Sequence, residues 1–386
     1  METREITADE VECLATGAGV LGTGGGTHPY IELLNVRKLY RDGKPARLVD
    51  PQALADHANV AVVGFMGAPL VTKERLTDPA HAVVPVTMME DYTGRPFDAV
   101  MTIEIGSENA MRPLMIGAPL DLPVVDADTM GRAFPEAQMS SFAIRGLPLD
   151  PYAMADIRNN RLIISRAADQ LWTERIGRRA CTEMGSIAAT CSAPRSGREV
   201  KNHALLGSVS RAIRLGRAVH QARQAHASPI RAVLEAEQGV HLFTGKVADI
   251  ARRTTEGFVR GTAMIAGLDD FAGSTFSVDF QNEFTIGRRD GAVRVTVPDL
   301  ICILDSLSGE ALGTETIRYG QRVSVLALPA PAVVLTEAGT SAVEEVMPAF
   351  NREEAQVTGG LTVEETATLA RLLRTVLRTA EDLGNR

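Results

Sequence analysis

Two carboxylates stand two residues apart at the end of a short apolar run. A buried strand is expected over Leu122–Asp126, and Asp128, Arg132 and Glu136 follow it closely. Crowded carboxylates raise one another's pKa, so they can hold a proton, activate water or bind a divalent cation. The alternative is that Asp126 or Asp128 caps a helix N-terminus, which would use only one of them. We predict that Asp126, Asp128 and Glu136 are catalytic, and that Arg132 binds substrate and serves as their counter-charge.

A glycine-rich stretch, LGTGGGTHPY, runs from Leu21 to Tyr30. Such a run lets the backbone adopt positive φ and lets an anion or a planar ligand approach main-chain N–H groups. It lacks the spacings of the dinucleotide-binding and P-loop motifs, so a nucleotide is not predicted. The alternative is a tight structural turn. We predict that this stretch binds substrate through Thr23, Gly24, Gly25, Gly26 and His28.

His28 could also serve as an acid, a base or a metal ligand, although a lone histidine is more often a surface or capping side chain. The cofactor is left open by the residues alone. If the protein uses a divalent metal, either zinc or manganese, we expect Asp126, Asp128 and His28 to hold it.

Polar side chains also stand at two other places in the strand pattern. Glu104 ends an expected strand over Ala99–Glu104 and is predicted to be catalytic, with Asn109 behind it as a substrate contact. We predict that Gln281, Asn282 and Glu283 bind substrate, because the two amides can bind the N–H and C=O groups of a ring. A structural hydrogen-bond network is the competing interpretation at both places. Met66, beyond the expected strand over Asn59–Gly64, is the last substrate-binding candidate.

The four cysteines, Cys13, Cys181, Cys191 and Cys302, show no CxxC spacing. They predict neither a zinc ribbon nor a disulfide framework, and reduced thiols fit a cytoplasmic location. Cys181 has no histidine near it in the sequence, so inert packing is favoured over a nucleophilic role.

The charge balance bears on possible partners. The formal net charge is −8, which argues against a nucleic-acid partner because phosphate binding needs a basic face. The acidic N-terminus does not resemble a secretory signal, and glycine and proline interrupt every apolar stretch before it reaches membrane-spanning length. We therefore expect a cytoplasmic protein that does not cross a membrane.

The periodicity predicts a two-domain α/β protein. A helix is expected over Thr7–Gly19, with Thr7 and Glu10 forming a capping box, and strands alternate with helical stretches after it. This pattern indicates a mainly parallel sheet in an α/β domain over residues 1–165. Helical stretches near 167–190 and 204–227, and then short alternating strands over Gly239–Pro329, predict a helical connection and a small β-barrel over residues 166–350.

The tail over residues 351–386 is expected to be helical, because leucines recur at helical spacing between Glu364 and Leu383 and Thr362 with Glu365 could form a capping box. Such a stripe must be covered, either by the same chain or by a second copy. We expect a homo-oligomer. We also expect the two domains to share one pocket that contains Glu283, Asp126 and the backbone of Gly24–Gly26, because interdomain clefts are frequent ligand sites.

The chain resembles the S-methyl thiohydantoin desulfurase family, once a domain of unknown function and associated with hydantoinase and oxoprolinase genes. The resemblance covers about Glu10 to Phe350 and lies in these motifs, in order: GTGGGTHPY, MGAPLV, PVVDADTMGRAFPEAQM, LWTERIGR, EMGSIA, LFTGKVADIARRTTEGF, QNEF, VPDLICILDSLSGE and TETIRYGQRV. It implies a three-layer N-terminal α/β domain and a C-terminal part that contains a β-barrel.

The resemblance also implies an activity, which is hydrolysis of a methylthio-substituted hydantoin ring to hydantoin and methanethiol. The sequence departs from the family pattern at Thr27 and His28, where relatives carry glycine and an acidic residue. The rival functions are a metal-dependent cyclic amidohydrolase or oxoprolinase-type enzyme, and a ligand-binding subunit without catalysis. In each case the partner is a small cyclic molecule.

Overall fold

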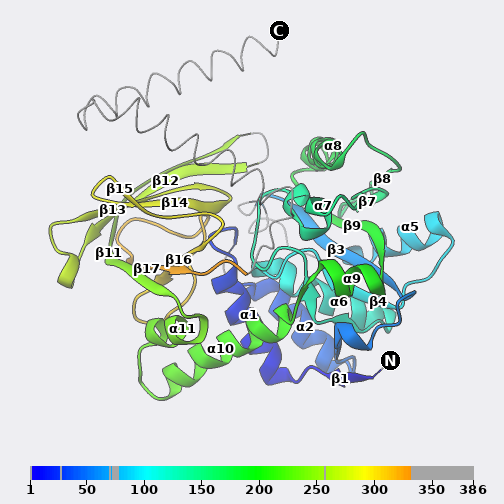
Figure 1. Cartoon of the computed structure of the whole chain (residues 1–386), viewed down its shortest axis with the longest axis horizontal. Coiled ribbons are helices and arrows are strands. Elements are labelled where there is room, and N and C mark those ends of the chain that lie inside the picture. The colour runs from blue at the N-terminus through cyan, green and yellow to red at the C-terminus, as the bar shows by residue number, and fades with distance from the viewer. Residues whose placement is uncertain (1, 27, 69–70, 72–77, 256–257, 332–386) are drawn as a thin grey trace, which may run out of the picture. The chain divides into compact units, whose positions relative to one another are not determined.

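The computed structural model describes residues 2–26, 28–68, 71, 78–255 and 258–331. This part of the chain contains two large sheets with helices packed around them, which confirms the α/β class (Figure 1). The predicted helical tail and its leucine stripe lie outside the described residues. The expected homo-oligomer, which rests on that stripe, therefore stays a prediction.

The first large sheet has eight strands in the order β1-β2-β5-β4-β3-β9-β7-β8. Its strands are β1 Thr3–Glu5, β2 Arg47–Val49, β3 Asn59–Gly67, β4 Ala99–Thr102, β5 Val124–Val125, β7 Tyr152–Ala155, β8 Arg161–Ile164 and β9 Ile187–Ser196. Only the pairs β2–β5, β5–β4 and β4–β3 are parallel, and the other four are antiparallel. The sheet is therefore mixed, whereas the sequence predicted a mainly parallel one. The difference arises because β9 pairs antiparallel with β3. Strands β7 and β8 then extend the sheet from β9 through further antiparallel pairs.

Helices cover both faces of this sheet, because successive side chains of a strand point to opposite sides. Ala61 and Val63 of β3 belong to one core with the α5 and α6 side chains, and Val60 and Val62 belong to another with α7 and α9. The helices of this region are α2 Tyr30–Arg41, α4 Pro79–Ala82, α5 Val84–Thr93, α6 Arg112–Leu120, α7 Ser141–Ile144, α8 Gln170–Glu183 and α9 Gly197–His203.

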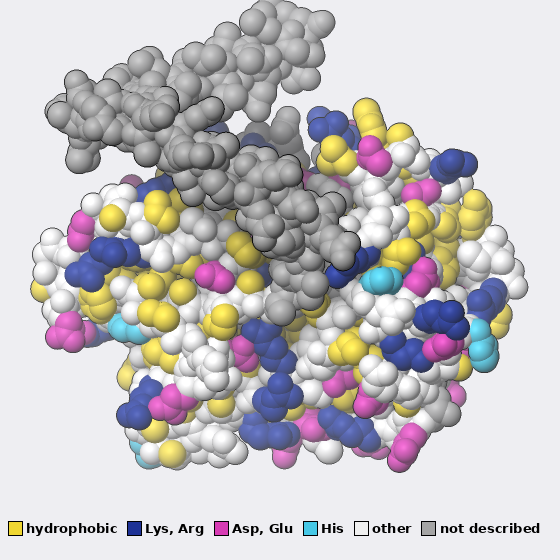
Figure 2. Space-filling model, viewed as in Figure 1, with side chains coloured by type: hydrophobic (Ala, Val, Ile, Leu, Met, Phe, Trp, Pro, Cys, Tyr) yellow, Lys and Arg dark blue, Asp and Glu magenta, His cyan; other side chains and the backbone are white. Residues whose placement is uncertain are grey.

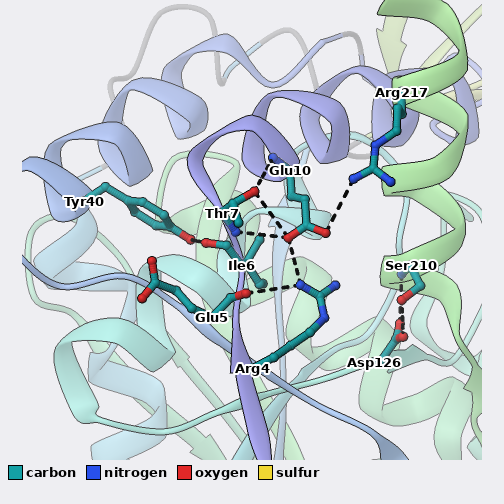
Figure 3. Close-up of polar contacts among 9 residues, drawn as sticks. All are labelled: Arg4, Glu5, Ile6, Thr7, Glu10, Tyr40, Asp126, Ser210 and Arg217. Carbon is teal, nitrogen blue, oxygen red and sulfur yellow. Dashed lines mark hydrogen bonds and ion pairs between the residues drawn. The ribbon is translucent and has the colours of Figure 1, made fainter. Parts of the chain in front are cut away.

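Helix α1 (Ala8–Leu21) begins at the capping box predicted from the sequence. The Thr7 side chain accepts a hydrogen bond from the Glu10 N–H, and the Glu10 carboxylate accepts one from the Thr7 N–H (Figure 3). The helix then runs against α10 (Ser208–Gln224) at very short range. A Cβ added to Gly216 of α10 would overlap the carbonyl oxygen of Cys13. Close contact between the two backbones thus requires glycine at this crossing.

We expect Gly216→Ala to destabilise the protein by roughly 1–3 kcal/mol, because the added methyl group forces the two helices apart. The measurement is the urea unfolding midpoint. Gly177→Ala in α8 is the matched control, since its Cβ would lie 3.4 Å from the Met154 sulfur, an ordinary contact. The control should be neutral or more stable, because alanine is the better helix former. Equal destabilisation of both variants would contradict the account of the crossing.

The second large sheet is antiparallel throughout, with seven strands in the order β15-β14-β13-β12-β11-β17-β16. Its strands are β11 Val240–Thr255, β12 Phe258–Gly267, β13 Thr275–Gln281, β14 Glu283–Arg289, β15 Ala292–Thr296, β16 Leu300–Asp305 and β17 Arg322–Leu328. Among the described residues, no ladder joins the edge strands β15 and β16, so the sheet is curled but not closed. The predicted small closed barrel is therefore replaced by a half-barrel.

Alternate side chains of the second sheet pack in opposite directions. Ile301 and Ile303 of β16 point into the curled sheet, where they meet its phenylalanines. Leu300, Cys302 and Leu304 of the same strand share a core with α1, α10 and α11 (Pro229–Glu237). A separate two-stranded ladder joins β6 (Ala127–Asp128) and β10 (Leu205–Leu206). The packing of β16 on α1 brings the half-barrel next to the loop that follows α1.

The visible face of the molecule mixes basic and acidic side chains, as Figure 2 shows. On α10, Arg211 pairs with Glu237 and Arg217 with Glu10. No helix of the described residues has the length and apolar character needed to cross a membrane.

Candidate functional site

A cavity of about 100 Å³ lies among segments that are far apart in the sequence. Its walls come from the glycine-rich loop, the ends of β3 and β4, the turn after β4, helix α8 and the turn between β13 and β14. Its charged and amide side chains are Glu104, Glu108, Asn109, Glu174, Arg178, Asn282 and Glu283. A cavity of roughly 150 Å³ takes up benzene, so this volume is of the order that suits a small ring.

Glu104 lies directly beyond β4, where the sequence placed it. One carboxylate oxygen accepts a hydrogen bond from Asn109 Nδ2 at 2.5 Å, and the other accepts one from the Phe134 N–H at 2.9 Å. Asn109 is held in turn, since its Oδ1 accepts a hydrogen bond from the Phe65 N–H. Burial raises the pKa of Glu104 to about 7, against the lowering effect of these two donors. The group can therefore take up and release a proton near neutral pH.

Glu283 enters the same cavity from the half-barrel. It is only 5% exposed, and its Oε2 has no hydrogen-bond partner among the described residues. Burial, and then the charge of Glu104, raise the pKa of Glu283 well above its ordinary value, while Arg132 and Arg178 act in the opposite direction. A buried carboxyl group with one oxygen that no donor reaches is stabilised as the neutral acid. Glu283 is thus the more strongly protonated of the two.

The turn that carries Glu283 is fixed by hydrogen bonds to β12. Asn282 has a positive φ of 58°, which is uncommon for a residue other than glycine. Its Oδ1 accepts a hydrogen bond from the Val259 N–H, and its own N–H donates to the Val259 carbonyl oxygen. Thr23 and Ser107, beside the cavity, also have positive φ. Strained backbone of this kind is concentrated at ligand sites.

The glycine-rich loop packs directly against these groups. A Cβ on Gly25 would overlap the Glu283 carboxylate, and a Cβ on Gly26, whose φ is 139°, would overlap Ser107 Oγ. The Thr23 carbonyl oxygen accepts a hydrogen bond from the Phe284 N–H at 2.8 Å, which fixes the loop to β14. Glycine is needed here because other groups occupy the space that side chains would take.

Arg132 lies behind the cavity and is almost fully buried. Its guanidinium donates to Thr23 Oγ1 at 2.8 Å and to the carbonyl oxygens of Pro298 and Asp299, both at 2.9 Å. It therefore joins the glycine-rich loop to the start of β16. Its positive charge also favours the ionised forms of Glu104 and Glu283. Arg132 was expected to contact substrate and to balance the charge of Asp126, Asp128 and Glu136, but it does not line the cavity.

Helix α8 contributes an ion pair that was not among the predicted site residues. Glu174 accepts a hydrogen bond from Arg178 Nε at 2.5 Å and another from the Ala137 N–H at 3.1 Å. Arg178 also donates to the Pro135 carbonyl oxygen and lies over the Phe258 ring at 4.4 Å. The sequence did carry a signal for this ion pair, because Glu174 and Arg178 stand four residues apart inside the LWTERIGR motif.

Asp126 does not reach this cavity. Its carboxylate accepts hydrogen bonds from the Ser210 N–H at 2.9 Å and from Ser210 Oγ at 2.5 Å, so it caps the start of α10 (Figure 3). Asp126 therefore caps a helix, as the alternative interpretation held, but the capped helix, α10, lies far along the chain. We expected one pocket with Asp126 and Glu283 together, but Asp126 does not line the cavity that Glu283 and Gly25 share.

Asp128 is fully buried and also lies outside the lining residues. Its Oδ2 accepts hydrogen bonds from the N–H groups of Ile105, Met130 and Gly131. Burial raises the pKa of Asp128 to about 6 in spite of these donors. It organises the loop behind Glu104 rather than facing the cavity.

The remaining predicted residues divide between the cavity and other places. Met66, Asn109, Asn282 and Gly25 line the cavity, whereas His28 lines two other hollows. Glu136 precedes a short turn and accepts a hydrogen bond from Gln138, and Gln281 pairs with Glu283 across the β13–β14 turn. The remaining predicted residues that are absent from the lining of the cavity are Thr23, Gly24, Gly26, His28, Glu136 and Gln281.

The conditional metal set is not assembled. Asp126 caps α10, Asp128 binds backbone N–H groups, and His28 lines separate hollows. Among the described residues, no group of three or more histidine, cysteine, aspartate or glutamate side chains is arranged to hold a metal ion. All four cysteines are free and buried, and Cys181 donates to the Met66 carbonyl oxygen, which supports its inert packing.

A prediction on stability follows from the burial of Glu283. Its pKa is raised in the folded protein, so above about pH 4.5 the folded state holds a proton that the unfolded state has lost. Stability must then fall as the pH rises toward the folded pKa. We expect Glu283→Gln to match the wild type in urea unfolding near pH 4.5 and to be more stable at about pH 8.5. A wild type that gains stability relative to this variant with rising pH would contradict the assignment.

Comparisons with known proteins agree with this architecture. The S-Me-THD-like N-terminal domain matches residues 9–166, and the S-Me-THD-like C-terminal domain matches residues 168–349. An X-ray structure of a protein from Chromobacterium violaceum has the same fold, with a TM-score of 0.68 and 22% identity over 93% of this chain and 98% of that chain. Among curated proteins, none matches.

Proposed function

Because the chain belongs to the S-Me-THD-like family, we propose that it is a hydrolase of a hydantoin-like ring. The reaction is the loss of methanethiol from an S-methyl thiohydantoin. Water adds to the ring carbon that bears the methylthio group, the C–S bond breaks, and the products are the hydantoin and methanethiol. The reaction needs a base for water and an acid for the ring nitrogen or the departing sulfur.

The observation that carries this proposal is the pair of carboxyl groups in one small cavity. Glu104 is held by two N–H donors, which favour its ionised form, whereas Oε2 of Glu283 has none among the described residues. We assign Glu104 as the base that accepts a proton from water and Glu283 as the acid that donates one. Two carboxyl groups with different surroundings commonly divide these roles.

The remaining lining residues fit a ring with polar edges. Asn109 and Asn282 bring amide groups to the cavity wall, and Met66, Ile103, Phe134 and Ile187 provide apolar surface. The side-chain amide of Asn109 also positions Glu104. A planar ring held between these surfaces would keep its reacting carbon next to both carboxyl groups, which is how positioning lowers a barrier.

The test is incubation of the purified protein with an S-methyl thiohydantoin, with thiol titration and mass spectrometry as readouts. The proposal predicts equal amounts of methanethiol and hydantoin. A parallel reaction with unsubstituted hydantoin should leave the ring intact. Ring opening without thiol release would instead favour the cyclic amidohydrolase, and binding without turnover would favour a ligand-binding subunit.

A further inference from the structure

Two adjoining hollows lie beside His28, apart from the cavity described above. Their volumes are about 240 Å³ and 480 Å³, and both are lined by His28, Tyr30, Glu310 and Ala311. No residue that lines them also lines the cavity with Glu104 and Glu283. Together they form a second concave region, which we call the His28 hollow.

The His28 hollow combines both signs of charge with hydroxyl and apolar groups. Arg223, at the end of α10, and Glu310, before the Ala311–Leu312 segment, both line it. Arg223 Nε donates to the Ser308 carbonyl oxygen at 2.7 Å, which holds the arginine at the wall. Ala311 and Leu312 add apolar surface, and Tyr30 is 58% exposed. Asp305 and Arg318 line the larger of the two hollows as well. Charged groups of both signs and an apolar surface together suit a small molecule that carries both charges.

We propose that the His28 hollow binds a free α-amino acid. Its carboxylate pairs with Arg223, its ammonium group with Glu310, and its side chain lies on Ala311, Leu312 and Tyr30. Guanidinium groups bind carboxylates in a fork geometry, and an ammonium group needs an acceptor such as a carboxylate. This goes beyond the proposed hydrolysis, which involves a different cavity.

The segment that forms one wall of the hollow also holds the glycine-rich loop. Leu312 and Thr316 line the hollow, and Thr314 lies between them. The Thr314 N–H donates to the Gly24 carbonyl oxygen at 2.9 Å, and its hydroxyl group lies 3.1 Å from the same oxygen and 2.8 Å from the Asn282 carbonyl oxygen. Gly24 and Asn282 are the immediate neighbours of Gly25 and Glu283. We expect an occupied hollow to affect the catalytic cavity through these contacts of Thr314.

The experiment is isothermal titration calorimetry of the wild-type full chain with L-leucine, N-acetyl-L-leucine and L-leucinamide. L-Leucine should bind saturably, and loss of either charge, in N-acetyl-L-leucine or in L-leucinamide, should weaken binding by about tenfold or more. Glu310→Gln and Arg223→Gln should each weaken L-leucine binding to a similar extent. Arg231→Gln is the matched control, because Arg231 is exposed on the neighbouring helix α11 and pairs only locally with Glu235.

Two results would overturn the proposal. One is the absence of saturable L-leucine binding up to roughly 10 mM, and the other is binding that survives both Glu310→Gln and Arg223→Gln. Glu283→Gln should leave L-leucine binding intact, so that binding can be judged without any turnover assay. In a protein that hydrolyses an S-methyl thiohydantoin, L-leucine should also change KM or kcat. Thr314→Val removes the hydroxyl contacts but keeps the N–H donor to Gly24, so it should reduce that change while binding persists. An unchanged response in Thr314→Val would refute the coupling.

Discussion

Replacing Glu283 by Gln is expected to lower kcat/KM for an S-methyl thiohydantoin by roughly 10²–10⁴-fold, because the variant keeps the shape of the side chain but cannot donate the acid's proton. Glu104→Gln should cause a loss of similar size, since an amide cannot accept a proton from water. Both rates are measured by thiol release. The wild-type rate should rise as the pH increases through about 7, where Glu104 becomes ionised, and should fall again when Glu283 loses its proton.

The matched control is Glu199→Gln. Glu199 completes the capping box of α9, a position where Gln serves as well as Glu, and it lies outside the cavity. This variant should retain both its activity and its unfolding midpoint. If Glu104→Gln and Glu283→Gln were as active as Glu199→Gln, the two carboxyl groups could not be the acid and the base.

The second large effect is expected for Gly25→Ala. The added Cβ would overlap the Glu283 carboxylate, so this side chain must shift from its place in the cavity. A displacement of about 1 Å can cost 10²-fold in rate. Gly25 does not have a positive φ, so alanine should fit the backbone without strain, and circular dichroism should show an unchanged fold.

The double variant Gly25→Ala/Glu283→Gln tests the reason for that loss. If Gly25→Ala acts through the Glu283 carboxyl group, it should cost much less activity in the Glu283→Gln background, because coupled groups are not additive. Full additivity of the two losses in kcat/KM would show that the added methyl group acts elsewhere in the cavity.

The local signals in the sequence predicted local structure well. The capping box at Thr7 and Glu10, the strand that begins at Asn59 and the alternating strands after Gly239 are all present. What the sequence could not supply was the choice of strand partners. The helical stretch expected over 167–190 ends at Glu183, and β9 begins at Ile187 and pairs antiparallel with β3. This pairing depends on contacts between distant segments, which leave no periodic pattern.

The candidate site was predicted in part for the same reason. Glu104, Asn109 and Glu283 were recognisable as polar residues at strand ends, and they line one cavity. Asp126 has the same local pattern, but the strand before it, Val124–Val125, is short and the next residues pair with β10, so its side chain meets Ser210 instead. Carboxylate spacing alone could not distinguish a cap on a distant helix from a catalytic group.

The most direct test of the central claim is a crystal structure of the wild-type protein with bound hydantoin, the proposed product. The ring is predicted to lie in the cavity lined by Glu104, Asn109 and Glu283, with hydrogen bonds to both carboxyl groups. A ring bound outside this cavity, in crystals of protein that releases methanethiol, would contradict the claim that these two carboxyl groups carry out the reaction.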